Sequence, residues 1–95
     1  MIVRGRSLKG YSVTFSSSAK KSLKKFDKRL AEQINKGLAR LVDGDPSVDV
    51  KKMQGQEELY RLRIGDYRII YEVHHHVIIV HVVKIGHRKD VYGNI

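Results

Sequence analysis

Hydrophobic and polar side chains alternate most regularly between Leu59 and Val73, in the segment LYRLRIGDYRIIYEV. Alternation with a period of two is typical of β-strands, because successive side chains point to opposite faces of a sheet. The Gly65-Asp66 pair in the middle is typical of a tight turn between two antiparallel strands. The pattern therefore predicts a β-hairpin with a two-residue loop.

The two faces of this hairpin differ in chemistry. One face is apolar and aromatic, and it carries Tyr60, Leu62, Ile64, Tyr67, Ile69, Tyr71 and Val73. On the other face, a two-residue loop places Arg63 directly across from Arg68. Arg61 lies on that face too, across from Ile70. Like charges opposed across strands destabilise a sheet, and guanidinium groups bind phosphate through paired, charge-assisted hydrogen bonds. The pattern therefore favours the interpretation that this face binds an anion. The alternative is that the arginines are simply exposed to solvent on an open sheet.

The N-terminal half predicts a strand followed by two helices. Residues 11–15 (YSVTF) alternate and are rich in β-forming residues. The serines at 16–18 offer an N-cap for a first helix, and Asp27 can cap a second. Apolar residues recur at helical spacing in both segments: Ala19, Leu23 and Phe26 in the first, and Leu30, Ile34, Leu38 and Leu41 in the second. Gly44 and Pro46 then end the second helix.

Residues 77–85 (VIIVHVVKI) form the most continuous apolar run, which is typical of a central strand covered on both faces. Residues 47–56 give only a weak strand signal. The expected fold is a single α+β domain over residues 1–95, in which two N-terminal helices pack on a small antiparallel sheet. The expected order of elements is β-α-α-β-β-β, followed by a short C-terminal tail.

Composition excludes several classes of protein. The chain has 95 residues, enough for one domain, and no cysteine, which excludes disulfides, thiolate catalysis and a cysteine-based zinc site. No apolar run is long enough to span a bilayer, and the first residues do not resemble a secretion signal, so a cytoplasmic protein is expected. A formal net charge of +9 favours a nucleic acid or an acidic protein as partner.

A run of lysines covers the predicted first helix and the start of the second. Lys20, Lys21, Lys24, Lys25 and Lys28 lie outside the apolar stripe of the first helix. Such a run is usually a solvated face. The functional alternative is contact with the phosphate backbone of RNA, which would not read sequence.

Histidines are concentrated near the last predicted strand. His74, His75 and His76 are consecutive and so point in different directions, and no further ligand cluster lies nearby in sequence, so no metal site is expected. His81 interrupts an apolar run. A two-residue turn at His75-His76 would place it across from Ile70, on the face of the arginines. The other interpretation is a histidine held by a hydrogen bond inside the fold. No cofactor is expected.

The C-terminal segment IGHRKDVYGNI adds further charged and titratable groups. Arg88 and Tyr92 follow the last strand and could fold towards Arg68. Cleavage of RNA without metal requires a base for the 2′-hydroxyl proton, an acid for the departing 5′-oxygen, and positive charge for the phosphorane between them. Arginines supply the charge but not the base. Tyr92 and His87 are therefore the candidates for the acid/base role.

Residues 60–73 (YRLRIGDYRIIYEV) and 85–92 (IGHRKDVY) follow a basic helical pair. Over roughly residues 11–92 the chain resembles the RelE branch of the RelE/ParE superfamily of bacterial and archaeal toxins. The resemblance implies an endoribonuclease that enters the ribosomal A site and cuts messenger RNA, leaving a 2′,3′-cyclic phosphate and a free 5′-hydroxyl. It also implies inhibition by a cognate antitoxin, usually encoded beside the toxin, and the charge of +9 favours an acidic one.

The resemblance also assigns roles by position. The two basic residues of the first hairpin strand correspond to Arg61 and Arg63, and the phosphate-contacting arginine of the next strand corresponds to Arg68. Arg88 corresponds to the arginine that acts on the leaving group or transition state, and Tyr92 to the terminal tyrosine that stacks on a base or acts as general base. RelE-type enzymes often carry lysine at the first two positions. The base role therefore shifts to the tyrosine here, with the histidine at 87 in reserve.

Two other functions fit the same sequence. A ParE-like inhibitor of DNA gyrase would share the fold and the antitoxin, but it would leave the co-occurrence of Arg68, Arg88 and Tyr92 without a purpose. A non-catalytic nucleic-acid-binding module would bind any polyanion in a salt-sensitive way and would not be toxic.

Overall fold

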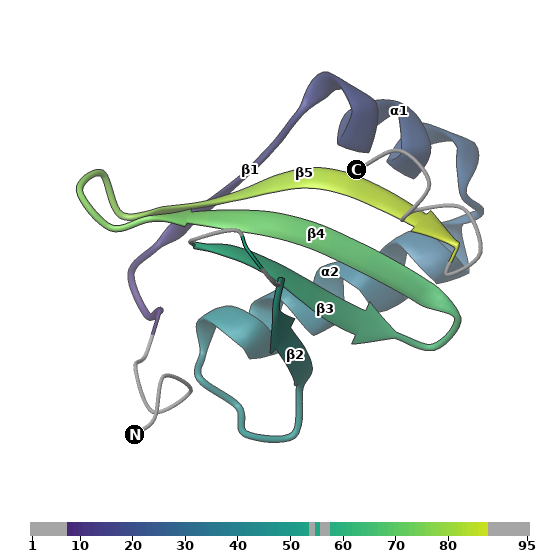
Figure 1. The fold of residues 1–95 in the computed structure, drawn as a ribbon. Helices are drawn as coiled ribbons and strands as arrows, with labels where there is room; N and C mark the ends of the chain where they lie inside the picture. The colour runs from purple at the N-terminus through teal and green to yellow at the C-terminus, as the bar shows by residue number, and fades with distance from the viewer. Residues whose placement is uncertain (1–7, 54, 56–57, 88–95) are drawn as a thin grey trace.

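The structure is a computed structural model that describes residues 8–53, 55 and 58–87. Its elements are β1 (Ser12–Phe15), α1 (Ser17–Lys25), α2 (Lys28–Val42), β2 (Asp49–Lys52), β3 (Leu59–Ile64), β4 (Tyr67–His74) and β5 (Ile79–His87). The strands form one five-stranded sheet in the order β1-β5-β4-β3-β2. In the view of Figure 1 the long helix α2 passes behind this sheet. The predicted α+β class is confirmed, as is the expectation that two helices follow the first strand and precede the remaining strands.

The helices begin where the sequence places their caps. The Ser16 side chain accepts a hydrogen bond from the Ala19 amide at 3.0 Å, and the Asp27 carboxylate accepts one from the Leu30 amide at 2.9 Å. Each cap satisfies an amide that has no partner inside its helix. Only the short connection at Phe26 and Asp27 separates α1 from α2. Ala19 of α1 and Ile34 of α2 belong to the same core cluster, so both helices cover the same face of the sheet.

The core lies between this helical layer and one face of the sheet. Its buried members are Leu8, Ala19, Ile34, Leu38, Leu41, Leu62, Ile69, Tyr71, Val73, Val80, Val82 and Ile85. Gly37 is buried in the middle of α2, where a Cβ would collide with the Ile64 side chain and lie 3.0 Å from its Cγ1. Glycine at this position therefore lets α2 approach the end of β3.

The hairpin formed by β3 and β4 has the predicted register. Ile64 pairs with Tyr67, and the two residues between them form the loop. Gly65 has a φ of +58° while Asp66 has no positive φ, as in the type II′ turn that favours glycine at its first central position. The sequence therefore fixes both the loop and the pairing of this hairpin.

Three features of the sheet differ from the expectation. The weak segment at 47–56 contains a fifth strand, β2, which pairs antiparallel with β3. β1 pairs with β5 in parallel, so the sheet is mixed rather than wholly antiparallel. The last strand begins at Ile79, two residues later than expected, because the loop after β4 spans four residues, 75–78.

Among the described residues, no helix is long and apolar enough to cross a membrane.

Candidate phosphate-binding site

The sheet has a second face, directed away from the helices, that carries Arg61, Arg63 and Arg68. Their neighbours Leu62 and Ile69 belong to the helix-side core, and adjacent residues of a strand point to opposite faces. We call this second surface the arginine face. The prediction that it gathers the three hairpin arginines is confirmed by the pairing of the strands.

Arg68 is the most unusual side chain of this face. It is only 8% exposed, although a guanidinium group is always charged and costly to remove from water. Its Nη1 donates a long hydrogen bond of 3.3 Å to the Tyr67 carbonyl. Its Nε is buried and has no hydrogen-bond partner within the described part of the chain. Arg63 lies directly across from it and Gly86 on its other side, so no acidic side chain is paired with it across either strand.

The other two arginines share one carboxylate. Asp49 on β2 lies 3.9 Å from Arg61 and 4.0 Å from Arg63, measured between side-chain nitrogen and oxygen atoms. Both distances are at the limit of an ion pair, and the Arg63 and Asp49 side chains are about half exposed. Such a contact is weak. An anion with more oxygens and a higher charge could therefore compete with Asp49 for these guanidinium groups.

Two lysines without a predicted role also lie on the arginine face. Lys51 on β2 pairs with Arg61, and Lys84 on β5 pairs with Ile70. Ile70 is 1% exposed and does not belong to the helix-side core. No local pattern predicts the position of either lysine, because their placement depends on which strands lie side by side.

His87 lies on the opposite side of the sheet from these arginines. It pairs with Tyr67, and the two rings meet edge-to-face with centroids 5.5 Å apart. Tyr67 in turn contacts Phe26 at the end of α1. Since Tyr67 and Arg68 are adjacent in one strand, they point to opposite faces. The structure therefore does not bring His87 together with Arg68.

His81 was expected across from Ile70, and this expectation is wrong. The four-residue loop moves the pairing by two positions, so His81 lies across from Glu72. Its Nδ1 is 2.7 Å from the Thr14 hydroxyl on β1. The alternative interpretation, a histidine held by a hydrogen bond, agrees with this contact.

The three consecutive histidines make separate contacts. His74 Nε2 lies 2.9 Å from Glu72, and His75 Nδ1 lies 2.7 Å from the Tyr11 hydroxyl. His75 Nε2 is also 3.4 Å from a Glu58 oxygen. Within residues 8–53, 55 and 58–87, no group of three side chains is arranged to hold a metal ion.

The remaining predicted site residues fall into two groups. Lys20, Lys21, Lys24, Lys25 and Lys28 are all exposed on the helical layer, away from the arginine face. They therefore form a separate cationic surface rather than part of one site. Arg88 and Tyr92 lie outside the described residues.

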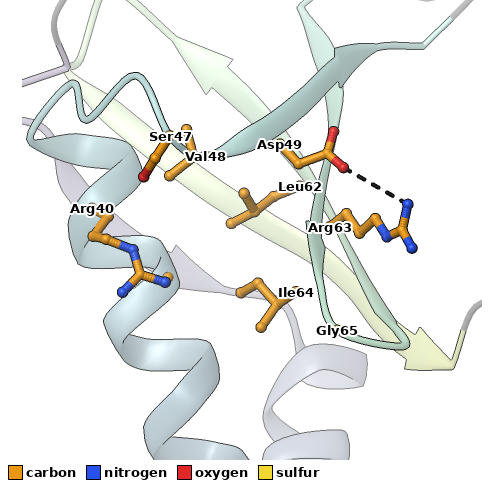
Figure 2. A pocket seen from close by; sticks show the side chains of 9 residues that line it. Arg40, Ser47, Val48, Asp49, Leu62, Arg63, Ile64 and Gly65 are labelled. Carbon is orange, nitrogen blue, oxygen red and sulfur yellow. Dashed lines mark ion pairs between the residues drawn. The ribbon is translucent and has the colours of Figure 1, made fainter.

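A pocket of about 240 Å³ lies between α2 and the β2–β3 edge. Figure 2 shows Leu62 and Ile64 directed towards α2, while Arg63 points away towards Asp49. The apolar side chains that line the pocket thus point towards the helices. Arg63 and Asp49 also line the pocket, so it borders the arginine face at the β2–β3 edge.

The chain belongs to the family described as ParE toxin of type II toxin–antitoxin system, parDE, because residues 13–92 match that family. A protein of Escherichia coli named as RelE-like toxin is 34% identical over 87 residues, which cover 87% of this chain and 90% of that protein. The mRNA interferase toxin RelE of Escherichia coli K12 is 29% identical over the same share of both chains.

Solved structures show the same fold. The isolated RelE toxin of Escherichia coli has a TM-score of 0.71 and 26% identity, covering 90% of this chain and 94% of that one. The RelE of the archaeal RelE–RelB complex from Pyrococcus horikoshii has a TM-score of 0.69 and 27% identity, covering 85% and 98%. The resemblance to the RelE/ParE superfamily is thereby confirmed.

Proposed function

We propose that this toxin is an endoribonuclease that cleaves messenger RNA in the ribosomal A site and so inhibits translation. The observation that carries the proposal is Arg68, a buried guanidinium whose Nε has no hydrogen-bond partner within the described residues, beside Arg63 and Arg61 on one face of the sheet. A multiply charged phosphate would satisfy these donors. Relatives named mRNA interferase add support. The whole chain, residues 1–95, is proposed to act as one domain in the cytoplasm.

In the proposed reaction the 2′-hydroxyl of one nucleotide attacks the adjacent phosphate. A base takes the hydroxyl proton, the P–O5′ bond breaks, and an acid protonates the 5′-oxygen, which leaves a 2′,3′-cyclic phosphate and a 5′-hydroxyl. Arg61, Arg63 and Arg68 supply the charge that stabilises the phosphorane. Arg88 is assigned to the leaving group. Tyr92 is preferred as general base, because the ring of the other candidate packs against Tyr67 on the far face.

The same proposal includes a protein partner. Complexes of relatives are named RelE–RelB and RelBE, each a toxin bound to an antitoxin. We propose that an acidic antitoxin, encoded adjacent to this toxin, forms a tight complex with it by charge-steered association. Co-expression of the two proteins should yield that complex. Recovery of free toxin alone would contradict the partner proposal.

The nuclease proposal is tested by inducing the toxin in a bacterium and mapping RNA ends across the transcriptome. Cuts should lie within translated codons, and they should disappear with Arg88→Ala. Lys36→Ala is a matched control, because Lys36 is an exposed cation on α2 without a role in the proposed site. Circular dichroism should show that both variants keep the fold. Intact translated messages in growth-arrested cells would refute the nuclease.

Inhibition of DNA gyrase is the second candidate, because the matched family carries the ParE name. It predicts that the purified toxin blocks supercoiling by purified gyrase without cutting RNA. The Arg88→Ala variant should then remain toxic. These two assays together separate the two functions.

A further inference from the structure

The β5 strand contains an irregularity beside the arginine face. Tyr71 pairs with Val82, whereas Ile70 pairs with Lys84, so Val83 is an extra residue without a partner on β4. This is a β-bulge, a feature that redirects side chains and is over-represented next to active sites. It occurs where β5 passes the middle of the sheet.

The bulge decides which residue joins the arginine face. If the pairing from the His74 end continued without it, Val83 would lie across from Ile70, and Lys84 would lie across from Ile69 on the core side. With the bulge, Ile85 takes the place across from Ile69 and is 3% exposed in the core. Lys84 is thereby moved to the face opposite the core.

The start of α1 holds this bulge in place. The Ser16 hydroxyl donates a hydrogen bond of 2.6 Å to the Val83 carbonyl, and the Ser16 amide donates one of 2.9 Å to the Val82 carbonyl. The same hydroxyl accepts from the Ala19 amide as the cap of the helix. Two hydrogen bonds from Ser16 therefore reach the bulge, and the third joins the same serine to the first turn of α1.

Lys84 lies one row away from the Arg63–Arg68 pair. It flanks Ile70 on one side, and Arg61 flanks the same residue on the other. The two rows are two residues apart along the strands, or roughly 7 Å, a separation comparable with that of successive phosphates in a single strand. Within the described residues Lys84 forms no ion pair, so its ammonium is available to an anion.

We propose that Lys84 is a further phosphate-binding residue, which contacts the phosphate next to the scissile one in single-stranded RNA. Arg63 and Arg68, together with Arg61 from the next row, bind the scissile phosphate, while Lys84 binds its neighbour and sets the register of the strand. The inference rests on the proposed ribonuclease function and deepens it. It requires positive charge at position 84, not a proton acceptor, so arginine should replace lysine there.

The experiment measures single-turnover cleavage of mRNA on programmed ribosomes as a function of toxin concentration. Lys84→Gln should raise the half-saturating concentration about tenfold and change the maximal rate much less. Lys84→Arg should stay within about threefold of the wild type, because it keeps the charge. Lys36→Gln, the matched loss of one exposed lysine, should behave as the wild type. Equal curves for Lys84→Gln and Lys36→Gln would overturn the inference.

A second measurement separates this inference from the nuclease itself. Binding of a short 2′-O-methyl RNA, which cannot be cut, is followed by fluorescence anisotropy at several salt concentrations. Loss of one phosphate contact in Lys84→Gln should reduce the slope of log affinity against log salt by about 0.7 relative to Lys36→Gln. If the wild type cuts no RNA but this difference is found, the phosphate contact stands and the nuclease fails. If the slopes of the two variants agree, the contact fails.

Discussion

Replacing Arg68 by methionine should make the protein more stable and inactive at the same time. Arg68 is 8% exposed, its Nε has no hydrogen-bond partner within the described residues, and Arg63 lies directly across from it. A buried charge with an unpartnered donor and a like charge across from it destabilises the fold, so Arg68 does not serve stability. Methionine has an unbranched, flexible side chain that can fill much of the same volume without a charge.

The magnitude follows from three contributions. A buried donor without a partner costs about 1–3 kcal/mol, and a like-charge pair opposed across two strands costs about 0.2–1 kcal/mol. Arg68→Met removes both costs. It also loses the hydrogen bond from Nη1 to the Tyr67 carbonyl, which at 3.3 Å contributes at most about 0.5 kcal/mol. The net gain in the free energy of unfolding is about 1–3 kcal/mol, or roughly 5–15 °C in Tm for a chain of this length.

Urea denaturation followed by circular dichroism measures this gain, and the ribosome assay measures the activity. Arg63→Met is the control, because Arg63 is about half exposed. Its replacement relieves the same repulsion across the strands but removes no buried donor, so the gain in stability should stay below about 1 kcal/mol. Sulfate or pyrophosphate should stabilise the wild type more than Arg68→Met, since an anion bound only to the folded state raises its stability. A loss of more than about 1 kcal/mol in Arg68→Met would refute the reasoning and make Arg68 a structural residue.

Two further predictions concern the core. Burial raises the pKa of Tyr71 above its ordinary value, so this tyrosine ionises first in the unfolded chain, and stability falls as pH rises beyond about 10. Tyr71→Phe should make that fall less steep, by up to about 1.4 kcal/mol per pH unit. Chemical denaturation between pH 9 and 11 measures this difference. Gly37→Ala should lower the free energy of unfolding by about 1 kcal/mol, because overpacking against Ile64 outweighs the helix propensity gained. In an Ile64→Val background, which removes the nearest carbon, the same change should be neutral or stabilising.

The hairpin arginines could be predicted because the information for their placement is local. Alternation assigns each side chain to a face, and the Gly65-Asp66 turn fixes the register, so the opposition of Arg63 and Arg68 follows from sequence alone. The helix caps at Ser16 and Asp27 are local in the same sense. Such features depend on residues only a few positions apart.

The remaining features depend on contacts between distant segments. The parallel pairing of β1 with β5 joins residues more than sixty positions apart, and no turn connects these strands. The position of His81 depended on a loop of unknown length, and a four-residue loop moved it by two positions. It therefore stayed on the expected face but lies across from Glu72 instead of Ile70. A shift by an even number preserves the face and changes only the neighbour.

A register shift by one residue has a larger consequence than a shift by two, and the bulge in β5 is such a one-residue shift. Residues 77–85 (VIIVHVVKI) are apolar almost throughout, so no regular alternation in the local sequence identifies Val83 as an extra residue. Yet this single residue exchanges the two faces of the strand from that point on. It directs Ile85 to the core and Lys84 to the arginine face. Which side chains form the site thus depends on the register of strand pairing as much as on residue type. The hydrogen bond from the Ser16 hydroxyl to the Val83 carbonyl stabilises the register that places Lys84 on the arginine face.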